Sequence, residues 1–97
     1  MRHEIILAPE AIEDLKRLSA RGRAQVRDAF ETHLRHEPTQ TSRSRIKRLR
    51  GLARPQYRLR VDEIRVFYDV EGGRVEILAI VMKSAVAAWL AGEGRKS

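Results

Sequence analysis

The sequence predicts an α+β fold in which a twisted antiparallel sheet is combined with an N-terminal helical hairpin and a short C-terminal helix. Two amphipathic helical patterns lie between residues 9 and 38, and three strand patterns lie between residues 57 and 82. The connections between these strands are too short for crossovers, so consecutive strands are expected to run antiparallel. A chain of 97 residues has room for one core, and we therefore expect a single domain over residues 1–97.

The first part of the chain is expected to form a short strand and two helices. The strand covers Glu4 to Leu7, and the first helix begins at Pro9, where the missing N–H of proline costs no hydrogen bond. A break near residues 19–22 separates the second helix, which Pro38 ends. Apolar stripes at helical spacing consist of Ala11, Ile12, Leu15 and Leu18 in the first helix and Val26, Phe30, His33 and Leu34 in the second. The two helices therefore form a hairpin with one apolar face.

A meander of three or four strands follows a polar loop at residues 39–45. Ile46 to Leu52 alternates imperfectly and is a candidate for the first of these strands. Tyr57 to Val61 and Ile64 to Val70 alternate apolar and polar side chains, which is typical of strands with one buried face. Val75 to Met82 is almost continuously apolar, which predicts a central strand covered on both faces.

The end of the chain completes the fold. A turn at Gly72-Gly73 precedes the last strand, and residues 85–91 are expected to form the short C-terminal helix. Residues 92–97 are expected to be a frayed tail. All helices are expected to cover the same face of the sheet.

Several classes of function are excluded by composition. The chain has no cysteine, so disulfides, thiolate metal sites and a cysteine nucleophile are ruled out. His33 and His36 beside Glu37 make a conceivable metal pair without an evident third ligand, so we expect no metal and no other cofactor. The start of the chain does not resemble a signal peptide, and the longest apolar run, Ile77 to Met82, is too short for a bilayer. We therefore expect a cytoplasmic protein that makes no membrane contact.

Positive charge is concentrated in one segment of the chain. The net charge is +7, and the segment from Arg43 to Arg65 accounts for all of it, because nine basic residues are opposed there by Asp62 and Glu63 alone. The basic residues are Arg43, Arg45, Lys47, Arg48, Arg50, Arg54, Arg58, Arg60 and Arg65. The remainder of the chain has eleven basic and eleven acidic residues. Arginine suits bidentate phosphate contacts, so this segment is expected to bind a polyanion, and we expect that polyanion to be RNA.

The strongest candidate site lies on the hairpin YRLRVDEIRVFYDV. If Asp62-Glu63 is its turn, Arg60 faces Arg65 and Arg58 faces Phe67 across the strands. Two arginines directly opposed on one face repel each other unless an anion lies between them. We therefore expect Arg60 and Arg65 to clamp a phosphate, and we expect alanine at either position to abolish activity while leaving the fold intact.

Aromatic side chains lie close to this charge in the sequence, and each has two interpretations. A positive surface with a few aromatic groups is typical of single-stranded nucleic-acid sites. Tyr57 and Tyr68, however, lie on the apolar side of their strands, where core packing competes with that interpretation. Trp89 either stacks on a base or packs the last helix onto the sheet.

These motifs together resemble the RelE/ParE superfamily of bacterial toxins from type II toxin–antitoxin modules. The similarity spans most of the chain and rests on APEAIEDLKRL, LRGL, YRLRVDEIRVFYDV and VEILAIVMKS. It implies a twisted antiparallel sheet flanked by helices. In the RelE branch it implies a ribosome-dependent endoribonuclease that cuts mRNA and thereby inhibits translation. It also implies three partners, namely the ribosome, mRNA and a cognate antitoxin that forms a hetero-oligomer with the toxin.

The resemblance also implies roles for individual residues. Arg58 and Arg60 match two basic positions of the RelE hairpin, Arg65 matches an arginine after the turn, and Lys83 stands in for a basic residue after the last strand. These four are the candidate catalytic residues. The remaining basic residues of the segment and one aromatic are candidates for RNA binding: Arg43, Arg45, Lys47, Arg48, Arg50, Arg54 and Trp89. RelE-type proteins also carry a tyrosine near the C-terminus, and none follows Lys83 here.

Two other functions compete with mRNA cleavage. The ParE branch of the same superfamily inhibits DNA gyrase and does not cut RNA. A third possibility is a non-catalytic member that only binds its antitoxin or nucleic acid. The arginine-rich hairpin favours the endoribonuclease, and the absent tyrosine leaves the alternatives open.

Overall fold

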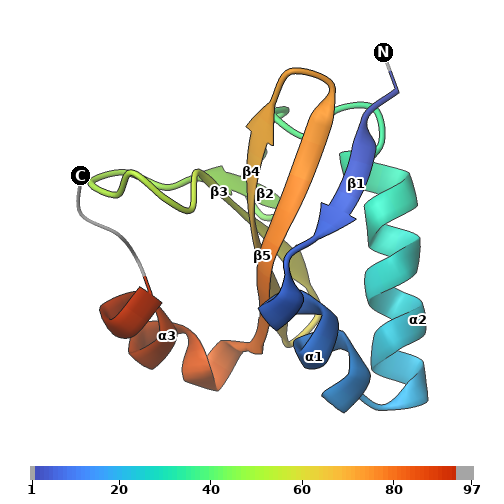
Figure 1. The fold of residues 1–97 in the computed structure, drawn as a ribbon, viewed down its shortest axis with the longest axis vertical. Coiled ribbons are helices and arrows are strands. Elements are labelled where there is room, and N and C mark those ends of the chain that lie inside the picture. Colours follow the sequence, from blue (N-terminus) through green and yellow to red (C-terminus); the bar gives the residue numbers. More distant parts are fainter. Residues whose placement is uncertain (1, 94–97) are drawn as a thin grey trace.

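The computed structural model describes residues 2–93 and confirms the α+β fold (Figure 1). The elements in chain order are β1 (Glu4–Leu7), α1 (Pro9–Arg17), α2 (Ala20–Ala29), the π-helical turn η1 (Phe30–Leu34), β2 (Ile46–Arg48), β3 (Tyr57–Val61), β4 (Ile64–Glu71), β5 (Arg74–Met82), the 3₁₀ turn η2 (Lys83–Ala85) and α3 (Val86–Glu93). None of the helices between residues 2 and 93 is long and apolar enough to cross a membrane.

The five strands form one sheet in the order β1-β5-β4-β3-β2. The pairs β2–β3, β3–β4 and β4–β5 are antiparallel, as the short connections predict. β1 instead pairs with β5 in parallel, so that Ile5 lies beside Val75 and Leu7 beside Ile77. Because β1 and β5 are separated by most of the chain, connection length carries no information about this pair. The sheet is therefore mixed, with one parallel edge.

The register of the β3–β4 hairpin is the one that the alternating pattern predicts. Val61 pairs with Ile64, Arg60 with Arg65, and Arg58 with Phe67. Asp62 has a φ of 55°, in the left-handed region that tight hairpin turns require at their first central residue. A two-residue turn leaves no freedom to slip, so the side-chain alternation of β3 continues directly into β4.

Both helices of the N-terminal hairpin begin with sequence-encoded signals. Pro9 occupies the first turn of α1, as expected. Ser19 caps α2, and its side-chain oxygen accepts a hydrogen bond of 3.0 Å from the backbone N–H of Gly22. α2 therefore starts at Ala20, inside the stretch where a longer break was expected.

The core lies between the helical hairpin and one face of the sheet. Val26 and Leu34 are fully buried against Leu59, Val66 and other apolar side chains of that face. Tyr68 is also fully buried, and its hydroxyl donates a 2.7 Å hydrogen bond to the carbonyl oxygen of Pro38. This confirms the core position expected for Tyr68, which removes its ring from any exposed site.

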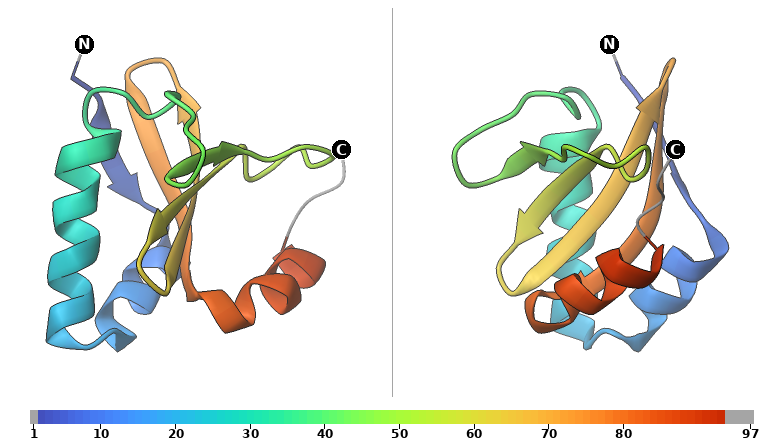
Figure 2. Two further views of the ribbon diagram at one scale, coloured as in Figure 1. Left: turned by 180° about the vertical axis from the view of Figure 1, so that it is seen from behind. Right: turned by 90° about the vertical axis from the view of Figure 1, so that its left-hand side faces the viewer.

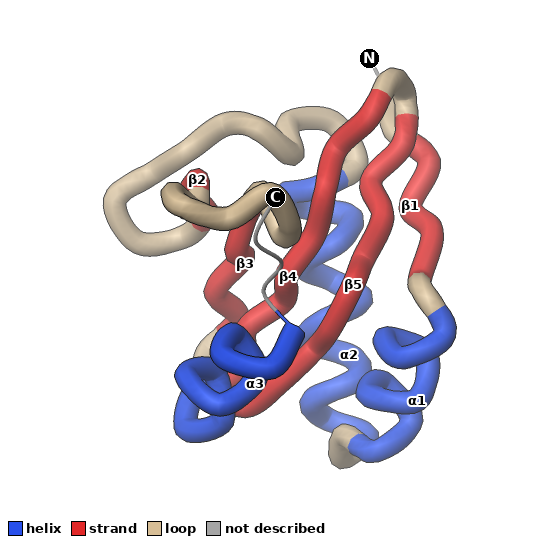
Figure 3. The backbone as a smooth tube through the Cα atoms, turned by 60° about the vertical axis from the view of Figure 1, so that its left-hand side comes forward, coloured by secondary structure: helices blue, strands red, loops and turns tan. Residues whose placement is uncertain are grey.

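α3 lies on the face of the sheet opposite α1 and α2, as the two views of Figure 2 and the tube of Figure 3 show. Its Trp89 stacks on Phe67 with ring centroids 4.6 Å apart and an interplanar angle of 17°. The expectation that all helices cover one face is therefore wrong. Phe67 is an apolar residue on the otherwise polar side of β4, and it creates a second packing surface there.

The bounds of β2 and α3 also differ from those that the sequence predicts. β2 covers only Ile46–Arg48, although residue 49 continues the pairing by one bond, from the N–H of Leu49 to the carbonyl of Gln56 at 2.8 Å. α3 includes residues 92 and 93, which were expected to belong to the frayed tail, while residues 94–97 lie outside the described part of the chain.

Candidate nucleic-acid interface

Basic side chains meet in two adjacent rows on the sheet face that points away from α1 and α2. In one row, Lys47 pairs with Arg58, which pairs with Phe67. In the next row, Arg60 pairs with Arg65, and the backbone N–H of Arg60 donates to the carbonyl of residue 45 at 2.8 Å. Three strands thus contribute positive charge to one face, because side chains two residues apart on a strand share a side.

Arg58 carries a buried polar atom that lacks a hydrogen-bond partner. Its side chain is half-buried, and its Nε is buried without a hydrogen-bond partner. Burial, followed by repulsion from Arg65 and Arg60, lowers the pKa of the Arg58 guanidinium below its usual range. Such a position disfavours the charged form, and an anion bound beside it would reverse the cost.

Arg65 is buried, with 6% of its surface exposed. Its Nη1 donates to the carbonyl oxygens of Asp62 at 2.7 Å and Ile64 at 3.0 Å. The guanidinium therefore turns back under the hairpin and holds the turn. Its charge remains close to Arg58 and Arg60, but one of its terminal nitrogens is already engaged by the backbone.

Arg60 is the exposed member of the arginine cluster, the name used below for Arg58, Arg60 and Arg65. None of the ion pairs formed by the described residues involves any of the three. The three charges therefore repel one another without a carboxylate to compensate them. This arrangement fits a site that is completed by a phosphate or another anion.

Lys83 lies beside the turn of the β3–β4 hairpin. Its backbone N–H donates to the carbonyl of Glu63 at 2.7 Å, which places the first residue of η2 beside the hairpin turn. The side chain is exposed, and among the described residues it makes no hydrogen bond or ion pair with the arginine cluster. Its expected assistance at the site remains a proposal.

The structure brings only some of the expected RNA-binding residues together. Arg45 and Lys47 adjoin Arg60 and Arg58 in the two rows. Arg43 and Arg50 are exposed in the flanking loops, and neither makes an ion pair or a side-chain hydrogen bond with the cluster within residues 2–93. The basic segment is thus divided into a part that meets the cluster and a part that surrounds it.

The side chains of Arg48 and Arg54 do not join the arginine cluster. The guanidinium carbon of Arg48 lies 5.1 Å from the centroid of Tyr57, on the side of the sheet that carries the core. Arg54 donates to Asp69 at 2.7 Å and to Glu76 at 3.2 Å, and the hydrogen bond to Asp69 raises its pKa. Strand alternation therefore places Arg48 on the face opposite the arginine cluster, and the charge of Arg54 is compensated by carboxylates.

Trp89 takes the packing role that was one of its two interpretations. It is half-buried and stacked on Phe67, whose position in the row of Arg58 places the aromatic pair beside the cluster. Phe67 was not among the expected site residues. The signal that could have identified it is an apolar side chain at a position between Arg65 and Asp69, where alternation requires a polar one.

Comparisons with known proteins show the family and the fold of the chain. The family model described as ParE toxin of type II toxin-antitoxin system, parDE, matches residues 5–85. No curated protein matches the chain significantly. Several solved structures share the fold.

The RelB-RelE antitoxin-toxin complex from Methanococcus jannaschii superimposes with a TM-score of 0.68 at 18% identity, over 87% of this chain and 96% of that chain. The RelE-RelB complex from Pyrococcus horikoshii OT3 gives 0.69 at 21% identity, over 86% and 97%. The toxin-antitoxin complex RelBE2 from Mycobacterium tuberculosis gives 0.66 at 24% identity, over 84% and 99%. At these identities the likeness establishes a common fold.

Proposed function

Because the chain belongs to the RelE/ParE superfamily of toxins from type II toxin–antitoxin systems, we propose that it is an mRNA endoribonuclease that inhibits translation on the ribosome. One observation carries this proposal. Arg58, Arg60 and Arg65 lie together on one sheet face, and Arg58 has a buried nitrogen without a partner. A half-buried guanidinium among like charges is costly in the free protein and favourable once a phosphate is bound.

The reaction that fits these groups is attack by the RNA's own 2′-hydroxyl on the adjacent phosphorus. The bond from phosphorus to the 5′-oxygen breaks, which leaves a 2′,3′-cyclic phosphate and a 5′-hydroxyl. Negative charge increases on the phosphate oxygens in the transition state. Arg58 and Arg60 are proposed to donate to these oxygens, while the buried charge of Arg65 adds to the field from beneath.

The arginine cluster offers few groups that could transfer protons in this reaction. No histidine lies within the rows of the arginine cluster, so acid–base catalysis by a histidine pair does not apply. Arg58 and Lys83 are the candidates for neutralising charge or assisting proton transfer, and an arginine is a poor general base. Much of the acceleration is then expected from holding the 2′-hydroxyl in line with the phosphorus, a geometry that the ribosome helps to impose.

A cognate antitoxin is proposed as the protein partner. Three of the structures that share this fold were solved as toxin–antitoxin complexes. The pair is expected to form a hetero-oligomer in which the antitoxin prevents RNA from reaching the arginine cluster.

Inhibition of DNA gyrase is the second candidate function. It is favoured by the family model, which describes ParE toxins and covers residues 5–85. In that case the arginine cluster would bind gyrase or its DNA rather than mRNA.

Induction of the protein in bacteria without its antitoxin tests the proposal. Primer extension would map mRNA 5′ ends for the wild type and for the double variant Arg58→Gln/Arg60→Gln. The matched control is Arg21→Gln/Arg27→Gln, which removes two exposed charges from α2. New cuts within translated regions that persist in the control and vanish in the cluster variant support the proposal. Growth arrest with intact mRNA and broken DNA transfers the assignment to gyrase.

A further inference from the structure

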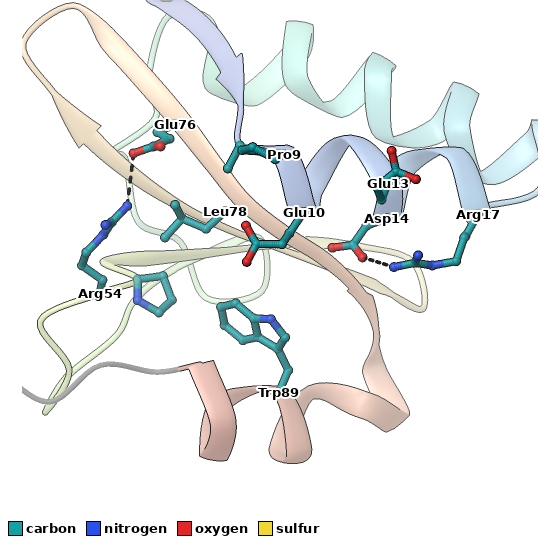
Figure 4. A pocket seen from close by; sticks show the side chains of 11 residues that line it. Pro9, Glu10, Glu13, Asp14, Arg17, Arg54, Glu76, Leu78 and Trp89 are labelled. Atoms are coloured by element: carbon teal, nitrogen blue, oxygen red, sulfur yellow. Dashed lines mark hydrogen bonds and ion pairs between the residues drawn. The ribbon is translucent and has the colours of Figure 1, made fainter.

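An open groove lies between α1, β5 and α3, and none of the residues that line it belongs to the arginine cluster (Figure 4). Its volume is about 650 Å³. Its floor includes Leu78 of β5, and Trp89 of α3 lines one wall while Glu10 of α1 points into it from another. A second cavity of about 550 Å³ adjoins it and shares Arg54 and Glu76 with it. The second cavity is lined by residues of β1, β4 and β5.

The charge of this groove is opposite to that of the protein. The two cavities are lined by six carboxylates and three guanidinium groups, in a chain whose net charge is +7. The carboxylates are Glu10, Glu13, Asp14, Asp69, Glu71 and Glu76, and the guanidinium groups are Arg17, Arg54 and Arg74. A surface of this kind repels the phosphates of nucleic acid and attracts cations.

Two of the basic groups are already neutralised within the groove. Arg17 pairs with Asp14 at 2.7 Å, and Arg54 pairs with Asp69 at 2.7 Å and with Glu76 at 3.2 Å. Glu10, in contrast, makes no ion pair among the described residues. It is exposed and faces the cavity that Trp89 lines (Figure 4).

A free carboxylate beside an indole ring is a suitable environment for a guanidinium or ammonium group. The carboxylate supplies charge, and the ring attracts cations through its negative π-face. Leu78 and the half-buried ring of Trp89 add apolar surface beside that position. The groove thus offers an anchor for a cation together with contacts for a neighbouring apolar side chain.

We propose that this groove docks a segment of the antitoxin in which arginine or lysine alternates with apolar side chains. The proposal rests on the antitoxin pairing stated under the proposed function. The two cavities adjoin at Arg54 and Glu76, which gives room for several residues of a partner segment, and their negative charge selects a basic one. The contact lies outside the arginine cluster, so it anchors the partner without using the groups that bind phosphate.

A second copy of this chain is a poorer occupant. Its segment from Ile46 to Arg50 has a suitable alternation of basic and apolar residues. However, Ile46 is buried in its own core, with 3% of its surface exposed, and residues 46–48 are paired in the sheet. The segment would have to leave its own fold in order to dock.

Trp89 is the single tryptophan of the chain, so its fluorescence reports on the groove. The test titrates the purified, folded protein with the acetylated, amidated pentapeptide Leu-Arg-Leu-Arg-Leu. The matched ligand replaces both arginines by citrulline, which keeps the shape and removes the charge. The matched protein variants are Glu10→Gln in the groove and Glu37→Gln, an exposed carboxylate outside the lining residues of both cavities.

The arginine peptide is expected to give a saturable change in fluorescence. We expect about tenfold weaker binding for the citrulline peptide and for Glu10→Gln, and unchanged binding for Glu37→Gln. The ligand comparison requires no protein variant, so a misfolded Glu10→Gln would not hide the answer. The measurement uses no RNA or ribosome, so loss of the nuclease assignment would leave its result unaffected.

Three results would overturn the proposal. The first is no saturable signal with the arginine peptide. The second is equal affinity for the arginine and citrulline peptides, which would show that the groove does not select a cation. The third is a wild-type dimer, seen by light scattering, that Glu10→Gln dissociates, because the occupant would then be a second copy of the chain.

Discussion

Arg60 and Arg65 lie directly opposite each other across the β3–β4 hairpin, yet Arg60 is exposed and Arg65 is buried. The difference arises because Arg65 donates to the carbonyls of Asp62 and Ile64 beneath the turn. One guanidinium is therefore available to a ligand, while the other is built into the hairpin. The two arginines should consequently respond differently to substitution.

Replacing Arg65 by alanine should reduce stability as well as activity. The change removes the donors to two carbonyl oxygens, one of which lies in a buried strand position, and we expect a loss of about 1–3 kcal/mol in the free energy of unfolding. Urea denaturation measures this directly. Arg60→Ala is the control and should stay within about 0.5 kcal/mol of the wild type. Equal stability of both variants would contradict the structural role of Arg65.

Replacing Arg58 by methionine should stabilise the fold and weaken RNA binding. The change removes a half-buried charge that Arg65 and Arg60 repel, while the stem keeps its packing. We expect a gain of about 0.5–1 kcal/mol, which raises the thermal midpoint by a few degrees. Calorimetry and RNA titration together check this. A variant that is less stable than the wild type would show that Arg58 is not strained in the free protein.

The salt dependence of RNA binding should report which arginines contact phosphate. For single strands, the slope of log K against log salt changes by about 0.7 for each phosphate neutralised. Replacing both Lys47 and Arg60 by glutamine should therefore reduce the slope by about 1.4. Arg54→Gln should leave it unchanged, because Asp69 and Glu76 already compensate that charge. Fluorescence anisotropy with a short labelled RNA supplies both slopes, and a clear decrease for Arg54→Gln would refute this division.

Trp89 should tolerate phenylalanine but not alanine. Phenylalanine preserves stacking on Phe67, whereas alanine removes a contact with centroids 4.6 Å apart and should cost about 1–3 kcal/mol. Thermal melts compare the two variants. If Trp89→Phe kept full stability but lost RNA cleavage, the ring would contact a base and the interpretation as packing alone would fail.

Stability should increase as pH rises through the range below 6.5. Burial and, secondarily, the charge of Arg45 lower the pKa of His33, while Asp28 opposes them. The unfolded chain, whose histidine keeps a pKa near 6.5, then binds more protons than the folded protein in that range. His33→Gln should flatten this part of the profile, as urea midpoints at several pH values would show. A profile that falls with pH over the same range would contradict the assigned direction.

Much of the candidate site follows from local sequence. Alternation in YRLRV and IRVFYDV, together with a two-residue turn, determines that Arg60 meets Arg65 and that Arg58 meets Phe67. Side-chain direction reverses at every strand residue, so the pattern of apolar residues specifies the register. Pro9 likewise marks the start of α1 through its own backbone geometry.

Contacts between segments far apart in the sequence decided the rest of the fold and of the candidate site. The parallel pairing of β1 with β5 joins segments about 70 residues apart, and no local pattern encodes it. The pairing of Arg54 with Asp69 and Glu76 is equally invisible in the segment from Arg43 to Arg65, where Arg54 is one of nine basic residues.

By itself, therefore, the sequence determined the elements, the hairpin register and the location of the excess charge. The tertiary structure decided which charges remain uncompensated, which face α3 covers, and where an acidic groove forms between α1, β5 and α3. The physical reason is that periodicity and turn chemistry act between neighbouring residues, whereas burial and ion pairing depend on segments that meet only after folding.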